Sequence, residues 1–146
     1  MVSLGKPPLN GRTDLTHMTA YAIDDEGSRD PDDAVSLDNS GQLWVHVADV
    51  ACLVAPDSAA DMEARARGAT LYQPDGTLPM MPTELVPRLG LGLAADGVGP
   101  ALSFRLDVSP EGSLVAAEVV LSMVRVERLS YEQAELLLAT NDSLRL

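Results

Sequence analysis

Aspartates crowd one short stretch of this chain, and their mutual repulsion constrains how it can fold. Asp24, Asp30, Asp32 and Asp33 stand at offsets of zero, six, eight and nine residues, with apolar residues on both sides. Burying like charges unpaired is very costly, so a fold that gathers these side chains is expected to recruit a cation. Carboxylate oxygens suit hard divalent ions, and Mg²⁺ typically binds one or two carboxylates plus a substrate phosphate. The cluster therefore suggests phosphate chemistry.

The same stretch has a competing interpretation as a solvated acidic turn. An EF-hand is excluded, because the aspartate spacing, the internal glycine and the closing glutamate that it requires do not line up here. Asp32 and Asp33 are adjacent, so in extended chain their side chains diverge. One of them can then bind a metal ion while the other reaches a second ion, a water or the substrate.

Size and charge limit what the chain can do by itself. A length of 146 residues fits one domain with a real core, and 46% apolar content argues against disorder. The net charge of −12 counts against strong binding to nucleic acid, because such binding depends on Lys and Arg. The single cysteine, Cys52, excludes an internal disulfide framework and is expected to be a core thiol. We find no signal peptide and no long apolar run, so we expect a cytoplasmic protein with no membrane contact.

Hydrophobic alternation and turn residues predict an α+β fold, with a largely antiparallel mixed sheet and short flanking helices. Residues 1–11 are expected to be a flexible lead-in, and a turn at 109–112 should connect two strands as a hairpin. The segment 73–99 is rich in Pro and Gly and should be mostly loop, with one short helical turn at 82–85. The expected strands are 19–23, 34–37, 43–47, 101–108 and 113–126, and the expected helices, both opened by capping-box patterns, are 58–67 and 130–139.

Several further motifs accompany the aspartates in a fixed order. Together they resemble the catalytic domain of the ribonuclease II and ribonuclease R family, whose members are processive, Mg²⁺-dependent 3′-to-5′ exoribonucleases. The resemblance covers residues 12–146 and corresponds to the N-terminal half of that catalytic domain, so we expect a fragment, a split subunit or a cleavage product. The motifs are Arg-Thr-Asp-Leu-Thr-His at 12–17, Leu-Trp-Val-His-Val-Ala-Asp-Val at 43–50, Arg-Gly-Ala-Thr-Leu-Tyr at 67–72, Leu-Pro-Met-Met-Pro at 78–82 and Arg-Leu-Ser-Tyr-Glu-Gln at 128–133.

The resemblance implies roles for individual residues. All four aspartates match the catalytic aspartates of the family, which hold Mg²⁺, or Mn²⁺, for two-metal phosphodiester hydrolysis. Tyr72 matches a tyrosine that stacks on bases at the 3′ end of the RNA, against the alternative of a half-buried strand tyrosine. Tyr131 matches a tyrosine near the cleavage site, against the alternative of packing at the core edge. Arg65 and Arg67 are candidates for contacting phosphate, and ordinary helix-surface charges explain them equally well.

Other polar residues have simpler interpretations. His46 lies in an apolar strand and is expected to be a buried residue with satisfied hydrogen bonds. His17 is expected to shape the entry to the first strand. Asp49 should cap the end of its strand or support the aspartate loop from behind.

The favoured function is part of an exoribonuclease that hydrolyses single-stranded RNA to nucleoside 5′-monophosphates. The expected partners are the C-terminal half of the catalytic domain and an OB-fold RNA-binding domain, in cis or as a separate chain. The alternative is a non-catalytic module for metal binding or protein interaction, derived from the same fold, and a Ca²⁺-binding domain is a weaker third interpretation. Without the remaining half, we expect little activity, open sheet edges and exposed apolar surface.

Overall fold

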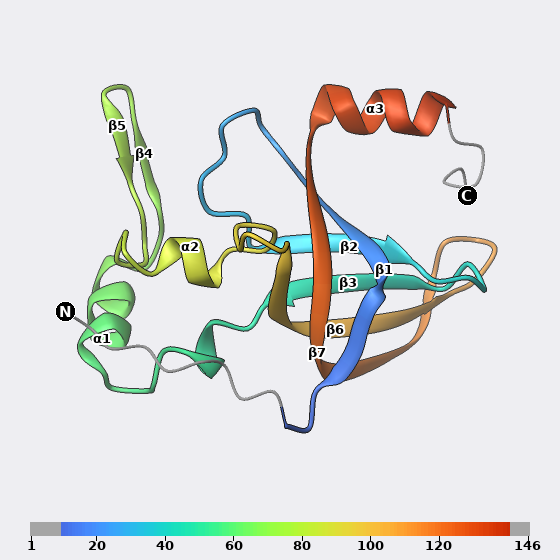
Figure 1. Ribbon diagram of the computed structural model, residues 1–146, viewed down its shortest axis with the longest axis horizontal. Coiled ribbons are helices and arrows are strands. Elements are labelled where there is room, and N and C mark those ends of the chain that lie inside the picture. The colour runs from blue at the N-terminus through green and yellow to red at the C-terminus, as the bar shows by residue number, and fades with distance from the viewer. Residues whose placement is uncertain (1–9, 141–146) are drawn as a thin grey trace.

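Five strands close into a barrel, in the order β1-β2-β3-β6-β7 (Figure 1). The computed structural model describes residues 10–140. The predicted lead-in at 1–11 therefore lies outside the described residues, apart from a turn at 10–11. The barrel strands are β1 (Thr13–Asp24), β2 (Asp33–Leu37), β3 (Leu43–Ala48), β6 (Val98–Val108) and β7 (Leu114–Ser130).

The sheet is mixed, as the sequence predicted, but its closure was not predicted. Neighbours in the order β1-β2-β3-β6-β7 pair antiparallel, whereas β1 and β7 pair parallel and close the barrel. The expectation of open sheet edges is therefore wrong for the barrel, because the first and last strands satisfy each other. Apolar surface is nevertheless exposed on the N-terminal part of β7, at Leu114, Val115 and Val119.

The segment 73–99 holds more regular structure than expected. Strands β4 (Leu71–Gln73) and β5 (Gly76–Leu78) form a separate two-stranded hairpin. A turn forms at the predicted 82–85, where the Leu85 amide donates to the Pro82 carbonyl at 2.9 Å, and helix α2 (Val86–Leu89) follows it directly. Pro87 stands in the first turn of α2, where a missing N–H costs no intrahelical hydrogen bond.

The two longer helices begin at the predicted caps. In α1 (Ala59–Arg67) the Ser58 hydroxyl accepts from the Asp61 amide, and Gly68 ends the helix at a φ of 77°. In α3 (Tyr131–Thr140) the capping box is reciprocal: the Ser130 amide donates to the Gln133 side chain at 2.8 Å, and the Gln133 amide donates to the Ser130 hydroxyl at 3.2 Å. The predicted N-cap of α1 at Ser58 and the capping box of α3 are thus confirmed, although the Asp61 carboxylate accepts from the Asp57 amide and not from the Ser58 amide. In the described part of the chain, no helix is long and apolar enough to span a bilayer.

Small side chains fill the narrow barrel. Its buried cluster is rich in alanine, and a second cluster joins α2 to the N-terminal part of α1. The barrel cluster comprises Leu15, Ala20, Ala22, Ala34, Ala48, Leu91, Ala101, Val124 and Val126.

A chain of polar contacts also crosses the barrel interior. His46 is 1% exposed and lies between the hydroxyls of Ser36 at 2.8 Å and Ser103 at 2.7 Å. Ser103 contacts the Ser122 hydroxyl at 2.5 Å, and that hydroxyl donates to the Ala101 carbonyl at 3.2 Å. The prediction that His46 is buried and satisfied is confirmed, and burial lowers the pKa of its imidazole to about 4.

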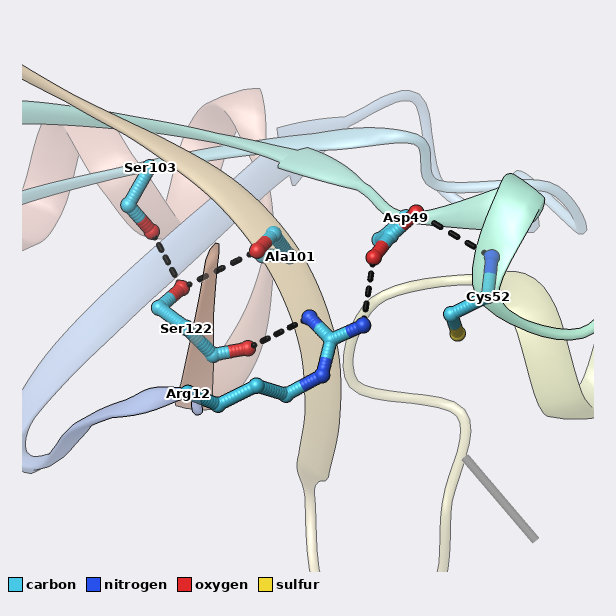
Figure 2. Close-up of polar contacts among 6 residues, drawn as sticks. All are labelled: Arg12, Asp49, Cys52, Ala101, Ser103 and Ser122. Atoms are coloured by element: carbon cyan, nitrogen blue, oxygen red, sulfur yellow. Dashed lines mark hydrogen bonds and ion pairs between the residues drawn. The ribbon is translucent and has the colours of Figure 1, made fainter. Parts of the chain in front are cut away.

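The polar chain continues into a buried ion pair (Figure 2). The Arg12 guanidinium donates to the Ser122 carbonyl at 3.3 Å and to an Asp49 carboxylate oxygen at 2.5 Å. Asp49 also accepts from the Cys52 amide at 3.2 Å, which caps the short helical turn Val50–Cys52 that follows β3. Asp49 therefore has one of the two roles predicted for it, that of a cap. Cys52 is only partly buried, and burial together with the Asp49 charge raises the pKa of its thiol.

Candidate functional site

The four aspartates lie along the loop that connects β1 to β2. Asp24 is the last residue of β1 and Asp33 the first residue of β2, so two barrel strands fix the ends of the loop. Backbone contacts fix its second half, because Leu91 donates to the Pro31 carbonyl and Ala48 donates to the Asp32 carbonyl, both at 2.8 Å. Figure 1 shows this loop rising between the β4–β5 hairpin and α3.

The aspartates lie within electrostatic reach of one another. Burial raises the pKa of the Asp24 carboxyl, and the charges of Asp33, Asp32 and Asp30 raise it further, while Arg128 lowers it. Asp24 and Asp30 are half-buried, whereas Asp32 and Asp33 are exposed. The cluster is therefore a region of crowded negative charge that a cation would relieve.

A metal ion fits this donor set chemically, but the protein alone does not supply a full cage. Among residues 10–140, no three His, Cys, Asp or Glu side chains converge on one position suited to a metal ion. Mg²⁺ commonly takes only one or two protein carboxylates and completes its shell with water and substrate phosphate. The carboxylates present fit such a shared site, in which the substrate supplies the missing ligands.

Two tyrosines stand beside the aspartates. Tyr72 on β4 and Tyr131 at the start of α3 line one depression of about 330 Å³ together with Asp24 and Asp30. Tyr72 is 75% exposed and Tyr131 is 59% exposed, so neither ring is packed in the core. The charge of Asp30, more than any other cause, raises the pKa of the Tyr72 hydroxyl, which places this side chain within the electrostatic field of the cluster.

Parallel pairing of β1 and β7 explains why Tyr131 lies near Asp24. The register pairs Asp24 with Ser130, and Tyr131 follows directly as the first residue of α3. Because the two strands run in the same direction, the loop after β1 and the helix after β7 leave the barrel at the same end. Residues from distant parts of the sequence thus meet at one site.

Arg67 is committed to contacts within the protein. Its guanidinium donates to the carbonyls of Pro79 and Met80 and to the Glu63 carboxylate at 2.7 Å, and its side chain is 19% exposed. These contacts tie the segment after the β4–β5 hairpin to α1. A phosphate contact by Arg67 stays a prediction, and it would require the guanidinium to give up part of this network.

The sequence interpretation passed over one cation at the site. Arg128 on β7 donates to the Ser28 carbonyl in the aspartate loop, and its charge lowers the pKa of Asp24. It pairs in register with Ala22, two residues before Asp24. The parallel register of β1 and β7 brings Arg128 close to Asp24. The motif at 128–133 does not reveal this proximity by itself. Arg65, by contrast, is a helix-surface charge that pairs with Asp57 at 2.5 Å and Asp61 at 3.0 Å.

Comparison with known proteins gives a consistent result. A family described as the RNB domain matches residues 12–146. Ribonuclease II, chloroplastic/mitochondrial, of Arabidopsis thaliana is 37% identical over 135 residues, which cover 89% of this chain and 17% of that protein.

Two solved structures share the fold. RNase R of Mycoplasma genitalium in complex with double-stranded RNA has a TM-score of 0.80 and 24% identity, and the match covers 95% of this chain and 26% of that one. Yeast Ssd1, described as a pseudonuclease, has a TM-score of 0.78 and 24% identity, with 96% of this chain and 18% of that one covered. The chain thus spans less than a third of the length of each of these three proteins.

Proposed function

We propose, because this chain belongs to the RNB domain family of the ribonuclease II and ribonuclease R type, that it forms part of a 3′-to-5′ exoribonuclease. Its substrate would be single-stranded RNA, and its products nucleoside 5′-monophosphates. Since the chain spans 17% of the length of its plant relative, the activity is proposed for this chain acting with the rest of a catalytic domain and an OB-fold domain, in cis or in trans.

One observation carries the proposal. Asp24, Asp30, Tyr72 and Tyr131 line a single depression, although they come from three separate parts of the sequence. Carboxylates suit the metal-assisted hydrolysis of a phosphodiester, and exposed aromatic rings suit the bases on either side of it. Their combination in one depression favours a nuclease over a general acidic surface.

Each group has a distinct task in the proposed reaction. A bound Mg²⁺ or Mn²⁺ would supply an activated water and stabilise the leaving 3′ oxygen. Asp24, Asp30, Asp32 and Asp33 would hold it together with the RNA phosphate. Burial raises the pKa of Asp24 and the charges of the other three aspartates raise it further, so the cluster is unfavourable until a cation binds.

The tyrosines would hold the RNA end. Tyr72 would stack on a base through its ring, an interaction worth about 1–3 kcal/mol that tolerates any base. Its 75% exposure leaves the ring available for stacking. Tyr131, adjacent to the residue that pairs with Asp24, would lie beside the scissile phosphate. Recognition without base-specific contacts suits degradation of any sequence.

The decisive experiment replaces a proposed ligand and a matched neighbour. Asp33→Asn should abolish Mg²⁺-dependent release of nucleoside monophosphates from single-stranded RNA while leaving RNA binding nearly intact. Asp25→Asn, which changes an exposed aspartate that lines the same depression but lies outside the motif, should retain activity. Both variants are made in the protein that contains the whole catalytic domain. Wild-type turnover in Asp33→Asn would overturn the catalytic assignment.

A second candidate is a non-catalytic binding module of the same fold. The structural likeness to a protein described as a pseudonuclease favours it. RNA binding without any Mg²⁺- or Mn²⁺-dependent hydrolysis in the wild-type protein would support this candidate over the nuclease.

A further inference from the structure

Thr70 connects the aspartate loop to the segment that carries Tyr72. Its hydroxyl donates to the Asp30 carboxylate at 3.1 Å, across 40 residues of sequence. The same oxygen accepts from the Met80 amide, also at 3.1 Å. Thr70, Asp30 and Met80 line one pocket of about 320 Å³, and Tyr72 follows two residues after Thr70.

The direction of these two hydrogen bonds is fixed by chemistry. A backbone amide can only donate, and an ionised carboxylate can only accept. The Thr70 hydroxyl must therefore accept from Met80 and give its single hydrogen to Asp30. The Thr70 hydroxyl binds only the Oδ2 atom of the Asp30 carboxylate, and this leaves the Oδ1 atom available to another ligand.

The support behind Thr70 is itself fixed. The Met80 carbonyl accepts from Arg67 at 3.1 Å, and Arg67 is bound in turn to Glu63 on α1 at 2.7 Å. A continuous series of contacts thus runs from α1 through Met80 and Thr70 to the Asp30 carboxylate. Residues that hold a metal ligand from behind tune metal affinity without touching the metal.

We propose that Thr70 is a positioning residue, which orients the Asp30 carboxylate and fixes it relative to the hairpin that bears Tyr72. This inference rests on the proposed function, since it gives Asp30 the task of a metal ligand. The pairing of β4 with β5 holds Tyr72 on its hairpin without this hydroxyl. Loss of the hydroxyl should therefore weaken metal binding and slow hydrolysis without weakening the grip on RNA.

The test compares Thr70→Val, which keeps the shape and removes the hydroxyl, with Thr70→Ser, which keeps the hydroxyl. Thr16→Val is a matched control, because the Thr16 hydroxyl donates to the Asp14 carboxylate at 2.7 Å, away from the proposed site. Mn²⁺ affinity is measured by electron paramagnetic resonance in the complete protein. Single-turnover rate, KM for RNA and melting temperature are measured alongside.

We expect Thr70→Val to lower Mn²⁺ affinity and the single-turnover rate by roughly 10-fold or more, with KM for RNA unchanged. Thr70→Ser and Thr16→Val should both bind Mn²⁺ as the wild type does. Wild-type Mn²⁺ affinity in Thr70→Val, or failure of Thr70→Ser to restore it, would overturn the positioning role and leave the proposed function standing. A wild-type protein that binds no Mn²⁺ would overturn both.

Discussion

Protonation of His46 should set the acid stability of the barrel. The folded imidazole is buried between two serine hydroxyls, and burial lowers its pKa from 6.5 to about 4. The unfolded chain therefore binds a proton on His46 below pH 6.5, while the folded chain resists it until about pH 4. Stability that is present at neutral pH is lost as the pH falls through this window.

The size of the effect follows from the two pKa values. With 6.5 unfolded and about 4 folded, the loss is about 2 kcal/mol at pH 5 and about 3 kcal/mol at pH 4. This is a large share of the marginal stability of a small domain. The Asp38 carboxyl, whose pKa the Ser40 hydroxyl and neighbouring donors lower to about 2, titrates below this window and does not obscure it.

Urea unfolding of the wild type and His46→Gln at pH 7, 6 and 5 measures this loss. The glutamine amide can donate to one serine and accept from another, but it does not titrate in this range. The difference between the two free energies of unfolding isolates His46, because Asp24 and other groups titrate alike in both proteins. Curves that stay parallel between pH 7 and pH 5 would refute the assignment of the acid sensitivity to His46.

Three further predictions test the site and the barrel. Tyr72→Ala should weaken the grip on short RNA and lengthen the final undigested oligonucleotide, whereas Tyr72→Phe should be nearly silent, and identical end products for Tyr72→Ala and the wild type would exclude stacking. Arg12→Met should lower the free energy of unfolding in urea by about 3–5 kcal/mol, because it leaves Asp49 buried without its cation. The double variant Arg12→Met with Asp49→Leu should lose less free energy of unfolding than Arg12→Met alone. Gly97→Ala should cost roughly 1–2 kcal/mol, because φ is 68° and the new Cβ would lie 3.0 Å from the Val126 carbonyl, and an unchanged unfolding midpoint would contradict that strain.

Local patterns predicted local structure well. The capping boxes at Ser58 and Ser130 mark the starts of α1 and α3, and the turn at 109–112 joins β6 and β7 as a hairpin. These features depend on residues a few positions apart, whose side chains satisfy nearby backbone groups. The burial of His46 was also predictable from local sequence, since apolar residues surround it in its own strand.

Long-range pairing was not predictable in this way. Nothing near Thr13 or Ser130 in the sequence indicates that β1 and β7 pair parallel, because each strand also reads as part of an antiparallel sheet. The β4–β5 hairpin was missed because its strands are three residues each, too short for a periodic pattern. Thr70 was missed because its partner Asp30 lies 40 residues away.

The candidate site depends on that one unpredicted pairing. The register of β1 against β7 is irregular between Asp14 and Thr19, where β1 uses more residues than its partner. Beyond the irregularity the pairing is regular up to Asp24 and Ser130, so the two strands end level with each other. This alignment matters because Asp24 is the last residue of β1 and Tyr131 is the first residue of α3. Strands that end at the same level bring these two residues together. Side chains alternate between the faces of a strand, so a shift of one residue would turn Asp24 away from the loop aspartates. The aspartate motif therefore supplies the charges, and the barrel closure determines where they meet the tyrosine.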